Sequence, residues 1–166
     1  AWALTHEILG ATTPLVIAGR LPEHSAFTPD PRRMAKMLGL DLRTLLFPGY
    51  VEEAHKPAIY RGAVCFAFPS RYEGFGLPPL EALCHGVPVV GSNVSAIPKV
   101  VGDAGILVAP DDVPGFASAL VAVATDAGLR AQLGARALAQ AARFSWDKTV
   151  QETLTAYEEV HRERSI

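Results

Sequence analysis

Short apolar runs alternate with helical patterns along the chain up to residue 109. Five runs are nearly continuous in apolar residues and are bounded by Gly or Pro, which is typical of strands buried on both faces. They span residues 14–19, 44–49, 64–69, 87–92 and 104–109. The segments between them predict helices, some very short, over 30–40, 51–63, 78–86 and 95–102. This alternation predicts right-handed crossovers and an α/β fold whose mostly parallel sheet carries helices on both faces.

The pattern changes after residue 109, where the strand signals stop. Residues 111–127, 128–144 and 145–164 predict three helices, with Gly128 as the first break and Ser145 as the cap of the last helix. The last helix carries an apolar stripe, which we interpret as a packing surface rather than a cofactor site. The stripe consists of Trp146, Val150, Leu154, Tyr157 and Val160.

The first ten residues predict a helix, because their apolar positions fall roughly on one face. A doubly wound fold usually opens on a strand. We therefore expect residues 1–166 to form a single domain that begins partway through a larger protein, without its first strand.

Composition narrows the class of protein. The chain has 166 residues, of which 49% are apolar and 19% are charged, with a net charge of −2, as expected for one globular domain. The lack of a basic run argues against nucleic-acid binding, and no charge-free stretch is suited to span a bilayer. Cys65 and Cys84 fall on apolar segments, which predicts buried, reduced thiols in a cytoplasmic protein.

The candidate chemistry is concentrated in residues 68–92, FPSRYEGFGLPPLEALCHGVPVVGS. Ligands of parallel sheets bind at the carboxyl ends of strands, so a ligand is expected beside the loop that follows Pro69. Glycines in this loop permit close backbone approach, and Pro78 fits the first helical position. The free N–H groups at this helix start predict an anion site, most often one for phosphate. They belong to Gly74, Phe75, Gly76 and Leu77.

Two glutamates, Glu73 and Glu81, flank this helix start. Glu81 falls about one turn into the helix, where its carboxylate can accept two hydroxyl donors of a ribose. Glu73, in the loop, can do the same for another polyol. Two carboxylates and a phosphate cradle favour a sugar nucleotide as ligand. The alternative is a first-turn Glu81 favoured by the helix dipole and a solvated Glu73, and the physical argument leaves both open.

Residues 69–112, PSRYEGFGLPPLEALCHGVPVVGSNVSAIPKVVGDAGILVAPDD, resemble the C-terminal, donor-binding half of the retaining GT-B glycosyltransferases of family 4. Glu73 and Glu81 match the signature pair of that family, with GFGLP between them. The resemblance implies a Rossmann-like domain followed by C-terminal helices. It also implies that Glu73 contacts the transferred sugar as the catalytic candidate, that Glu81 holds the ribose hydroxyls, and that the backbone of residues 74–77 contacts the diphosphate and sugar.

Further donor-binding candidates come partly from the same resemblance and partly from their place near predicted strand ends. The turn after TLLFPG resembles the one that cups the nucleobase, which implies roles for Tyr50 and Val51. Gly19, Arg20 and Arg71 stand near predicted strand ends and complete the set. Neither arginine occupies the position of the basic residues that neutralise the diphosphate in the family. Those residues, and the acceptor site, are expected in the missing part of the protein.

Two positions depart from the pattern of the family. Lys99 stands where the family commonly has Glu, and His85 stands where it often has a small residue. Both lie outside the GFGLP core, so they bear little on the class of protein that the resemblance implies.

The resemblance implies hexose transfer from a GDP- or UDP-sugar to a glycan or lipid, with retention, by an enzyme of which this chain is an inactive part. We expect no cofactor and no metal, because Asp111 and Asp112 directly precede a helix and predict capping. The expected partners are the sugar nucleotide and the missing N-terminal domain, with peripheral membrane association only through the full-length enzyme. The alternatives are a glycosidase, a non-catalytic nucleotide-binding or interaction module, and another GT-B enzyme such as a sugar-nucleotide epimerase.

Overall fold

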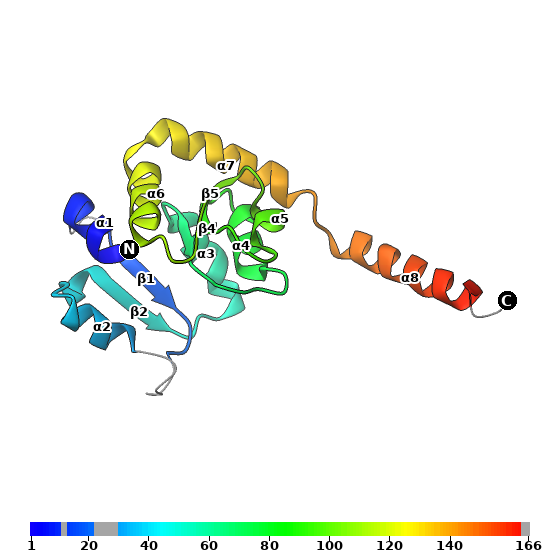
Figure 1. The fold of residues 1–166 in the computed structure, drawn as a ribbon, viewed down its shortest axis with the longest axis horizontal. Helices are drawn as coiled ribbons and strands as arrows, with labels where there is room; N and C mark the ends of the chain where they lie inside the picture. Colours follow the sequence, from blue (N-terminus) through cyan, green and yellow to red (C-terminus); the bar gives the residue numbers. More distant parts are fainter. Residues whose placement is uncertain (11–12, 22–29, 164–166) are drawn as a thin grey trace.

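The computed structural model describes residues 1–10, 13–21 and 30–163. Helices and parallel strands alternate along the chain up to β5, and three helices follow (Figure 1). The polar loop that the sequence predicts over 21–31 lies almost wholly outside the described residues. In chain order, the elements are α1 (Trp2–Leu9), β1 (Leu15–Ala18), α2 (Pro31–Met37), β2 (Leu45–Gly49), α3 (Lys56–Gly62), β3 (Phe66–Phe68), α4 (Leu77–Cys84), β4 (Val89–Ser92), α5 (Ile97–Val101), β5 (Gly105–Val108), α6 (Val113–Thr125), α7 (Ala127–Ala141) and α8 (Trp146–Glu163).

All five predicted strands form, each one to three residues shorter than its apolar run. Every strand pair in the described chain is parallel, as predicted. In the larger sheet, Val90 of β4 lies opposite Ala67 of β3 and Ile106 of β5. The five strands nevertheless form two sheets, β1–β2 and β3–β4–β5, rather than one.

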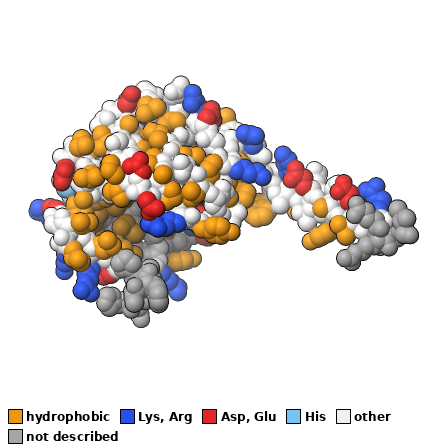
Figure 2. Space-filling view, viewed as in Figure 1, with side chains coloured by type: hydrophobic (Ala, Val, Ile, Leu, Met, Phe, Trp, Pro, Cys, Tyr) orange, Lys and Arg blue, Asp and Glu red, His pale blue; other side chains and the backbone are white. Residues whose placement is uncertain are grey.

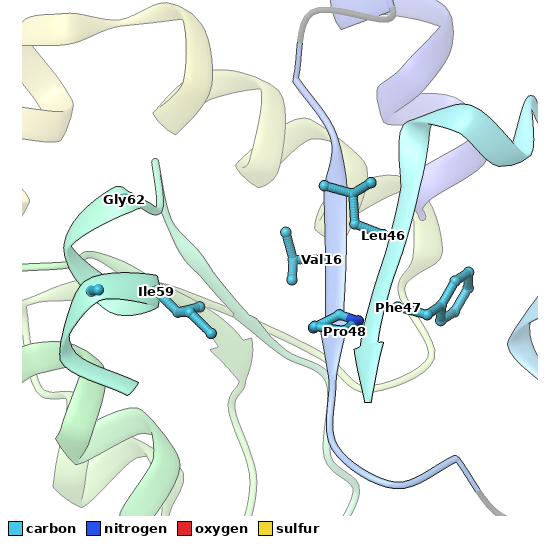
Figure 3. A pocket seen from close by; sticks show the side chains of 7 residues that line it. Val16, Leu46, Phe47, Pro48, Ile59 and Gly62 are labelled. Atoms are coloured by element: carbon cyan, nitrogen blue, oxygen red, sulfur yellow. The ribbon is translucent and has the colours of Figure 1, made fainter. Parts of the chain in front are cut away.

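A seam separates the two sheets. Val16 of β1 and Leu46 of β2 are 43% and 46% exposed, although parallel strands are normally covered on both faces. They border an open cavity of about 490 Å³ that faces α3 (Figure 3). The cavity is lined by Val16, Leu46, Phe47, Pro48, Ala58, Ile59 and Gly62. The smaller sheet is therefore incompletely buried, whereas β4 is buried along its whole length.

The core lies on both faces of the larger sheet. Val89 of β4 packs on one face with buried residues of α4, α5 and α7, such as Leu83 and Ile97. The next residue, Val90, packs on the other face with α6, where Phe116 and Val123 are buried. This alternation is the period of two that a strand imposes. Helix α1 in turn packs against α6, so the predicted helix cover on both faces is confirmed.

The boundary between α6 and α7 corrects the prediction that placed it at Gly128. Helix α6 ends at Thr125, and Asp126 is the N-cap of α7, with its carboxylate accepting the N–H of Leu129 at 2.8 Å. Gly128 lies inside the first turn of α7. An aspartate cap satisfies an orphan N–H at a helix start, which a glycine side chain cannot do.

The predicted cap of α8 is confirmed, because Ser145 Oγ accepts the N–H of Lys148 at 3.2 Å. Beyond this junction α8 projects from the body of the molecule (Figure 1). Its apolar stripe is at least half exposed at every position, and Figure 2 shows apolar side chains along one side of the projecting helix. The stripe predicted to be a packing surface therefore has no cover in the part of the chain that the structure describes.

The two cysteines differ in burial. Cys65 packs at the edge of the core beside α6, and this burial raises the pKa of its thiol to about 11. Cys84 is exposed, so the predicted burial is wrong for this residue. The reason is its position in α4, one residue past the buried Ala82 and Leu83 and therefore about 100° further round the helix. Both thiols are free.

Candidate functional site

The loop after β3 and the start of α4 form the centre of the candidate site. Helix α4 begins at Leu77, one residue earlier than predicted, with Pro78 and Pro79 in its first turn. Gly76 is the N-cap and has φ +102 and ψ +54, a backbone conformation that favours glycine. Among the described residues, no acceptor bonds the N–H groups of Gly74, Phe75, Gly76 and Leu77. These donors are thus free for an anion at the positive end of the helix dipole.

Glu73 is anchored at two points within this loop. The hydroxyl of Ser70 donates to Glu73 Oε1 at 2.9 Å. The hydroxyl of Ser95, in the loop after β4, bonds both the N–H and the carbonyl oxygen of Glu73. Glu73 is only partly exposed. Its carboxylate is therefore oriented by the fold, in contrast to the solvated side chain of the alternative interpretation.

Glu81 is the fifth residue of α4, and its carboxylate meets two side chains of α3. The Tyr60 hydroxyl donates to Oε2 at 2.8 Å, and Lys56 Nζ lies 3.6 Å from Oε1. Burial first, and the bond to Glu81 second, raise the pKa of Tyr60 above its usual value. The hydrogen bond from Lys56 to Glu53, at 2.6 Å, and the nearby Glu81 raise the pKa of the Lys56 ammonium group. A carboxylate has about four acceptor positions, so these contacts leave room for hydroxyl donors of a ligand.

The candidates at the ends of β1 and β2 are brought together. The N–H of Gly19 donates to the carbonyl oxygen of Gly49 at 2.8 Å. The guanidinium group of Arg20 lies 5.6 Å from the centre of the Tyr50 ring, which is mostly exposed. Val51 follows and leads into the short 3-10 turn Glu53–His55, which runs directly into α3. The segment after Tyr50 therefore connects with Glu81 through Lys56 and Tyr60.

Arg71 is not directed at this site through any contact in the described structure. Its guanidinium group pairs with Asp111 at the start of the α6 region, and both side chains are highly exposed. The neighbouring Asp112 is the N-cap of α6, because it accepts the N–H of Gly115 at 2.8 Å, which confirms the predicted capping. No three His, Cys, Asp or Glu side chains of residues 1–10, 13–21 and 30–163 lie close enough to hold a metal ion.

Phe75 contributes a side chain on another side of the loop. Its ring packs edge-to-face against Phe144, with 5.8 Å between the ring centres, and so touches the junction of α7 and α8. A cavity of about 330 Å³ lies there, and Lys99, Arg143 and Lys148 are among its lining residues. Phe75 thus ties the loop to the C-terminal helices.

Three residues of the site were not found from the sequence: Lys56, Tyr60 and Ser95. Ser70 opens the loop beside which a ligand is expected, but its position predicted no specific role for it. Tyr60 stands 21 positions before its partner Glu81, and Ser95 stands 22 positions after Glu73, and neither spacing is a recognisable motif. His85, noted as a departure from the pattern of the family, stacks on Tyr60 with 5.7 Å between the ring centres.

Comparison with known proteins identifies the family. The sequence model of the family "Glycosyl transferases group 1" matches residues 2–126, which is most of the chain. The chain belongs to this family. O-antigen chain mannosyltransferase B of Escherichia coli is 47% identical over 109 residues, covering 66% of this chain and 29% of that protein. A D-inositol 3-phosphate glycosyltransferase of Acidothermus cellulolyticus is 36% identical over 165 residues, covering 96% of this chain and 36% of that protein. The chain thus spans about a third or less of these relatives.

Solved structures confirm the fold class. Sucrose-phosphate synthase of Thermosynechococcus elongatus aligns with a TM-score of 0.75 at 22% identity, over 97% of this chain and 49% of that chain. Anabaena HepE in complex with UDP aligns with a TM-score of 0.70 at 21% identity, over 93% of this chain and 53% of that chain. At such identities the likeness shows the fold alone, a Rossmann-like parallel α/β domain of the GT-B type. No helix within the described residues is both long and apolar enough to cross a bilayer.

Proposed function

We propose that this chain is the donor-binding part of a retaining glycosyltransferase that transfers a hexose from a nucleoside diphosphate sugar. The observation that carries the proposal is the arrangement around α4, in which free N–H groups of residues 74–77 lie between Glu73 and Glu81. The N–H groups bind the diphosphate, Glu81 accepts from the ribose hydroxyls, and Glu73 accepts from hydroxyls of the sugar. Membership of the glycosyl transferases group 1 family supports this assignment.

The reaction breaks the bond between the anomeric carbon and the diphosphate oxygen, and the oxygen of an acceptor hydroxyl takes its place on the same face of the sugar. The proton of that hydroxyl passes to the leaving diphosphate. Negative charge develops on the leaving diphosphate as that bond breaks. Donors fixed in advance at the helix start stabilise this charge without reorganising, as an oxyanion hole does. Glu73 orients the sugar toward the acceptor rather than acting as an acid, and orientation of this kind lowers the barrier. The proposed reaction requires no metal.

Relatives indicate which donors to test first. Two of the similar proteins named above are a mannosyltransferase and a D-inositol 3-phosphate glycosyltransferase, and HepE was solved with UDP. GDP-mannose and UDP-sugars are therefore the first probes. We propose that Tyr50 and Val51 contact the base, because Tyr50 lies beside Arg20 and the two residues lead into the segment that contacts Glu81.

We also propose that the acceptor site belongs to further sequence of the full-length protein. The two curated relatives named above are more than twice as long as this chain. The separation of the two sheets supports the same view, because a strand inserted between β1 and β3 would pair with the free edge of each. Cytoplasmic location and membrane association through the full-length enzyme remain predictions.

A binding panel tests the proposed function. The melting temperature of the chain is measured with GDP-mannose, UDP-glucose, GDP, UDP and a free mannose oligosaccharide, each well above its expected dissociation constant. We expect a sugar nucleotide and its nucleoside diphosphate to raise the melting temperature, because ligands that bind only the folded state stabilise it. The oligosaccharide should have no effect. Stabilisation by the oligosaccharide alone would favour the glycosidase alternative, and stabilisation by none would contradict the proposal.

Glu73→Gln separates a glycosyltransferase from a non-catalytic nucleotide-binding module. The substitution removes the charge and one acceptor oxygen while it keeps the size of the side chain. We expect it to weaken binding of the sugar nucleotide and to leave the nucleoside diphosphate nearly unchanged. If the original chain bound the sugar nucleotide and the nucleoside diphosphate with equal affinity, the site would not recognise the sugar.

A further inference from the structure

We propose that Ser95 is a positioning residue that fixes Glu73 for contact with the donor sugar. The inference rests on the proposed function, in which Glu73 is the group that accepts hydrogen bonds from the sugar. Ser95 belongs to the loop between β4 and α5, and Glu73 to the loop between β3 and α4. One hydroxyl group thus joins the loops that follow two neighbouring strands of the larger sheet.

The hydroxyl bonds both polar groups of the Glu73 backbone. The N–H of Glu73 donates to Ser95 Oγ at 3.1 Å, and the same Oγ donates its proton to the carbonyl oxygen of Glu73. A hydroxyl group can act in both ways at once, since it carries one proton and two lone pairs. Glu73 is consequently held on both sides of its Cα, which fixes the direction in which its side chain leaves the chain.

The backbone of Ser95 is itself unusual. Its φ is +58, and among residues 1–10, 13–21 and 30–163 no other residue except glycine has a positive φ. This region is unfavourable for a residue with a Cβ, and such conformations persist where the surrounding structure requires them. Glycine would adopt the same φ without cost. The presence of a hydroxyl-bearing side chain at this position therefore points to a use for the hydroxyl.

No other described residue bonds the N–H or the carbonyl oxygen of Glu73. Ser70 Oγ lies 2.9 Å from Oε1 of Glu73 and 3.1 Å from the carbonyl oxygen of Tyr72, while the Arg71 side chain extends to Asp111. The N–H groups that follow, from Gly74 to Leu77, have no acceptor in the described chain. Loss of the Ser95 contact would therefore free the backbone of Glu73 itself, whereas the start of α4 is held separately by the buried Gly76 and Pro79.

The decisive measurement compares two substitutions by calorimetric titration with GDP-mannose and GDP, or with UDP-glucose and UDP if the chain binds that pair. Ser95→Ala removes the hydroxyl and keeps the unfavourable φ, and Ser95→Gly removes both. We expect each to lower the sugar-nucleotide affinity relative to that of its nucleoside diphosphate by roughly two- to tenfold, because the carboxylate must then be ordered on binding. Thr125→Ala is the matched control, since the Thr125 hydroxyl bonds only the backbone of its own helix at 2.8 Å.

Stability separates positioning from a general structural role. Ser95→Gly should be more stable than Ser95→Ala, because glycine tolerates the positive φ. If the affinity ratio recovered together with stability in Ser95→Gly, backbone strain at residue 95 and not loss of the hydroxyl would explain the lower ratio in Ser95→Ala. That result would overturn the proposal. In a Glu73→Gln background, Ser95→Ala should change the ratio no further. An additional loss there would show that Ser95 acts on the ligand by another route.

A ligand-free measurement tests the anchor itself. Hydrogen exchange of the Glu73 amide should be slow in the original chain and faster in both Ser95 variants, with Thr125→Ala unchanged. Equal exchange in all four would overturn the proposal whatever the ligand data show. Failure of the original chain to bind any sugar nucleotide, with the exchange difference present, would instead refute the proposed function and with it this role of Ser95. An unchanged affinity ratio in a chain that binds would refute the positioning role alone.

Discussion

At the scale of single residues, the Glu81 carboxylate has contacts within the protein and a proposed contact with the ligand. Tyr60 and Lys56 already engage its two oxygens from α3, which ties two helices together. The proposed ribose contact would use the remaining acceptor positions of the same group. A simple loss of binding on mutation would therefore not distinguish a ligand role from a structural one, and the ligand must be varied together with the protein.

Glu81→Ala should weaken binding of GDP or UDP more than binding of the 2′,3′-dideoxy analogue. Hydrogen bonds to a charged group contribute roughly 1.5–3 kcal/mol each, so we expect at least about a tenfold difference between the two losses. Titration calorimetry with both ligands measures it. Tyr60→Phe is the control, because it removes the hydroxyl partner at 2.8 Å and leaves the carboxylate in place. Equal losses for both ligands would assign Glu81 to stabilisation of α4 alone.

Cys65 should make the protein less stable in alkali. Burial raises the pKa of its thiol from 9.0 to about 11, so the folded state keeps the proton that the unfolded state releases. The folded state therefore keeps its full free energy of unfolding below about pH 9. It loses roughly 2–3 kcal/mol of this free energy as the pH rises to about 11. Urea unfolding at several pH values measures this slope. Cys65→Ala should flatten it, whereas the exposed Cys84, changed to Ala, should not.

The sequence identified the residues of the site that carry a motif, and missed those that depend on the fold. Glu73, Glu81 and the residues between them were found because their spacing and the glycines recur as a local pattern. Tyr60 and Ser95 reach the site from other elements, through contacts that no local spacing encodes.

At the scale of elements, the turn from β3 into α4 depends on Gly76. Its φ of +102 is costly for any other residue, and a Cβ there would meet only Pro79, at an ordinary 3.6 Å. The difficulty for a larger residue is thus the backbone conformation rather than a clash. A shift of this backbone would redirect the N–H groups of residues 74–77.

Gly76→Val should lower the free energy of unfolding by roughly 1–2 kcal/mol or more and abolish binding of both the nucleoside diphosphate and the sugar nucleotide. Gly74→Val is the matched control for stability, because Gly74 has no positive φ and a Cβ added there would meet no atom within 4 Å. Urea unfolding and titration with GDP or UDP give the two readings. Unchanged nucleotide affinity in folded Gly76→Val would rule out the phosphate cradle.

The strands were predicted well and the boundary between α6 and α7 was not, for physical reasons. The strands of the larger sheet are covered on both faces, so their sequences are apolar throughout and stand out between Gly and Pro. The break between α6 and α7 was assigned to Gly128 on propensity alone. In the structure the carboxylate of Asp126 caps α7, and this local hydrogen bond outweighs the weak preference of glycine against helix.

At the scale of the whole molecule, the five strands were predicted to form one sheet, and they form two. The apolar pattern locates strands but does not specify which strands pair with one another. The seam beside β1, with exposed Val16 and Leu46, is the structural sign of that difference (Figure 3). The exposed stripe of α8 is a second surface of the same kind, since its five apolar side chains face solvent on a helix that leaves the body.

The last prediction concerns α8. Its outer turns make no extensive contact with any other described element, whereas its first turns border the cavity beside Phe75. Truncation after Glu152 should therefore leave the melting temperature within about 2 °C of its original value, since it removes no core residue. A second truncation, after Asp126, should prevent folding, because it also removes the buried Leu133, Ala137 and Ala141 of α7. Thermal unfolding followed by circular dichroism compares the three chains. A drop of more than about 5 °C on the first truncation would show that the stripe of α8 packs against the body in solution, and that the projecting helix of Figure 1 is not its only position.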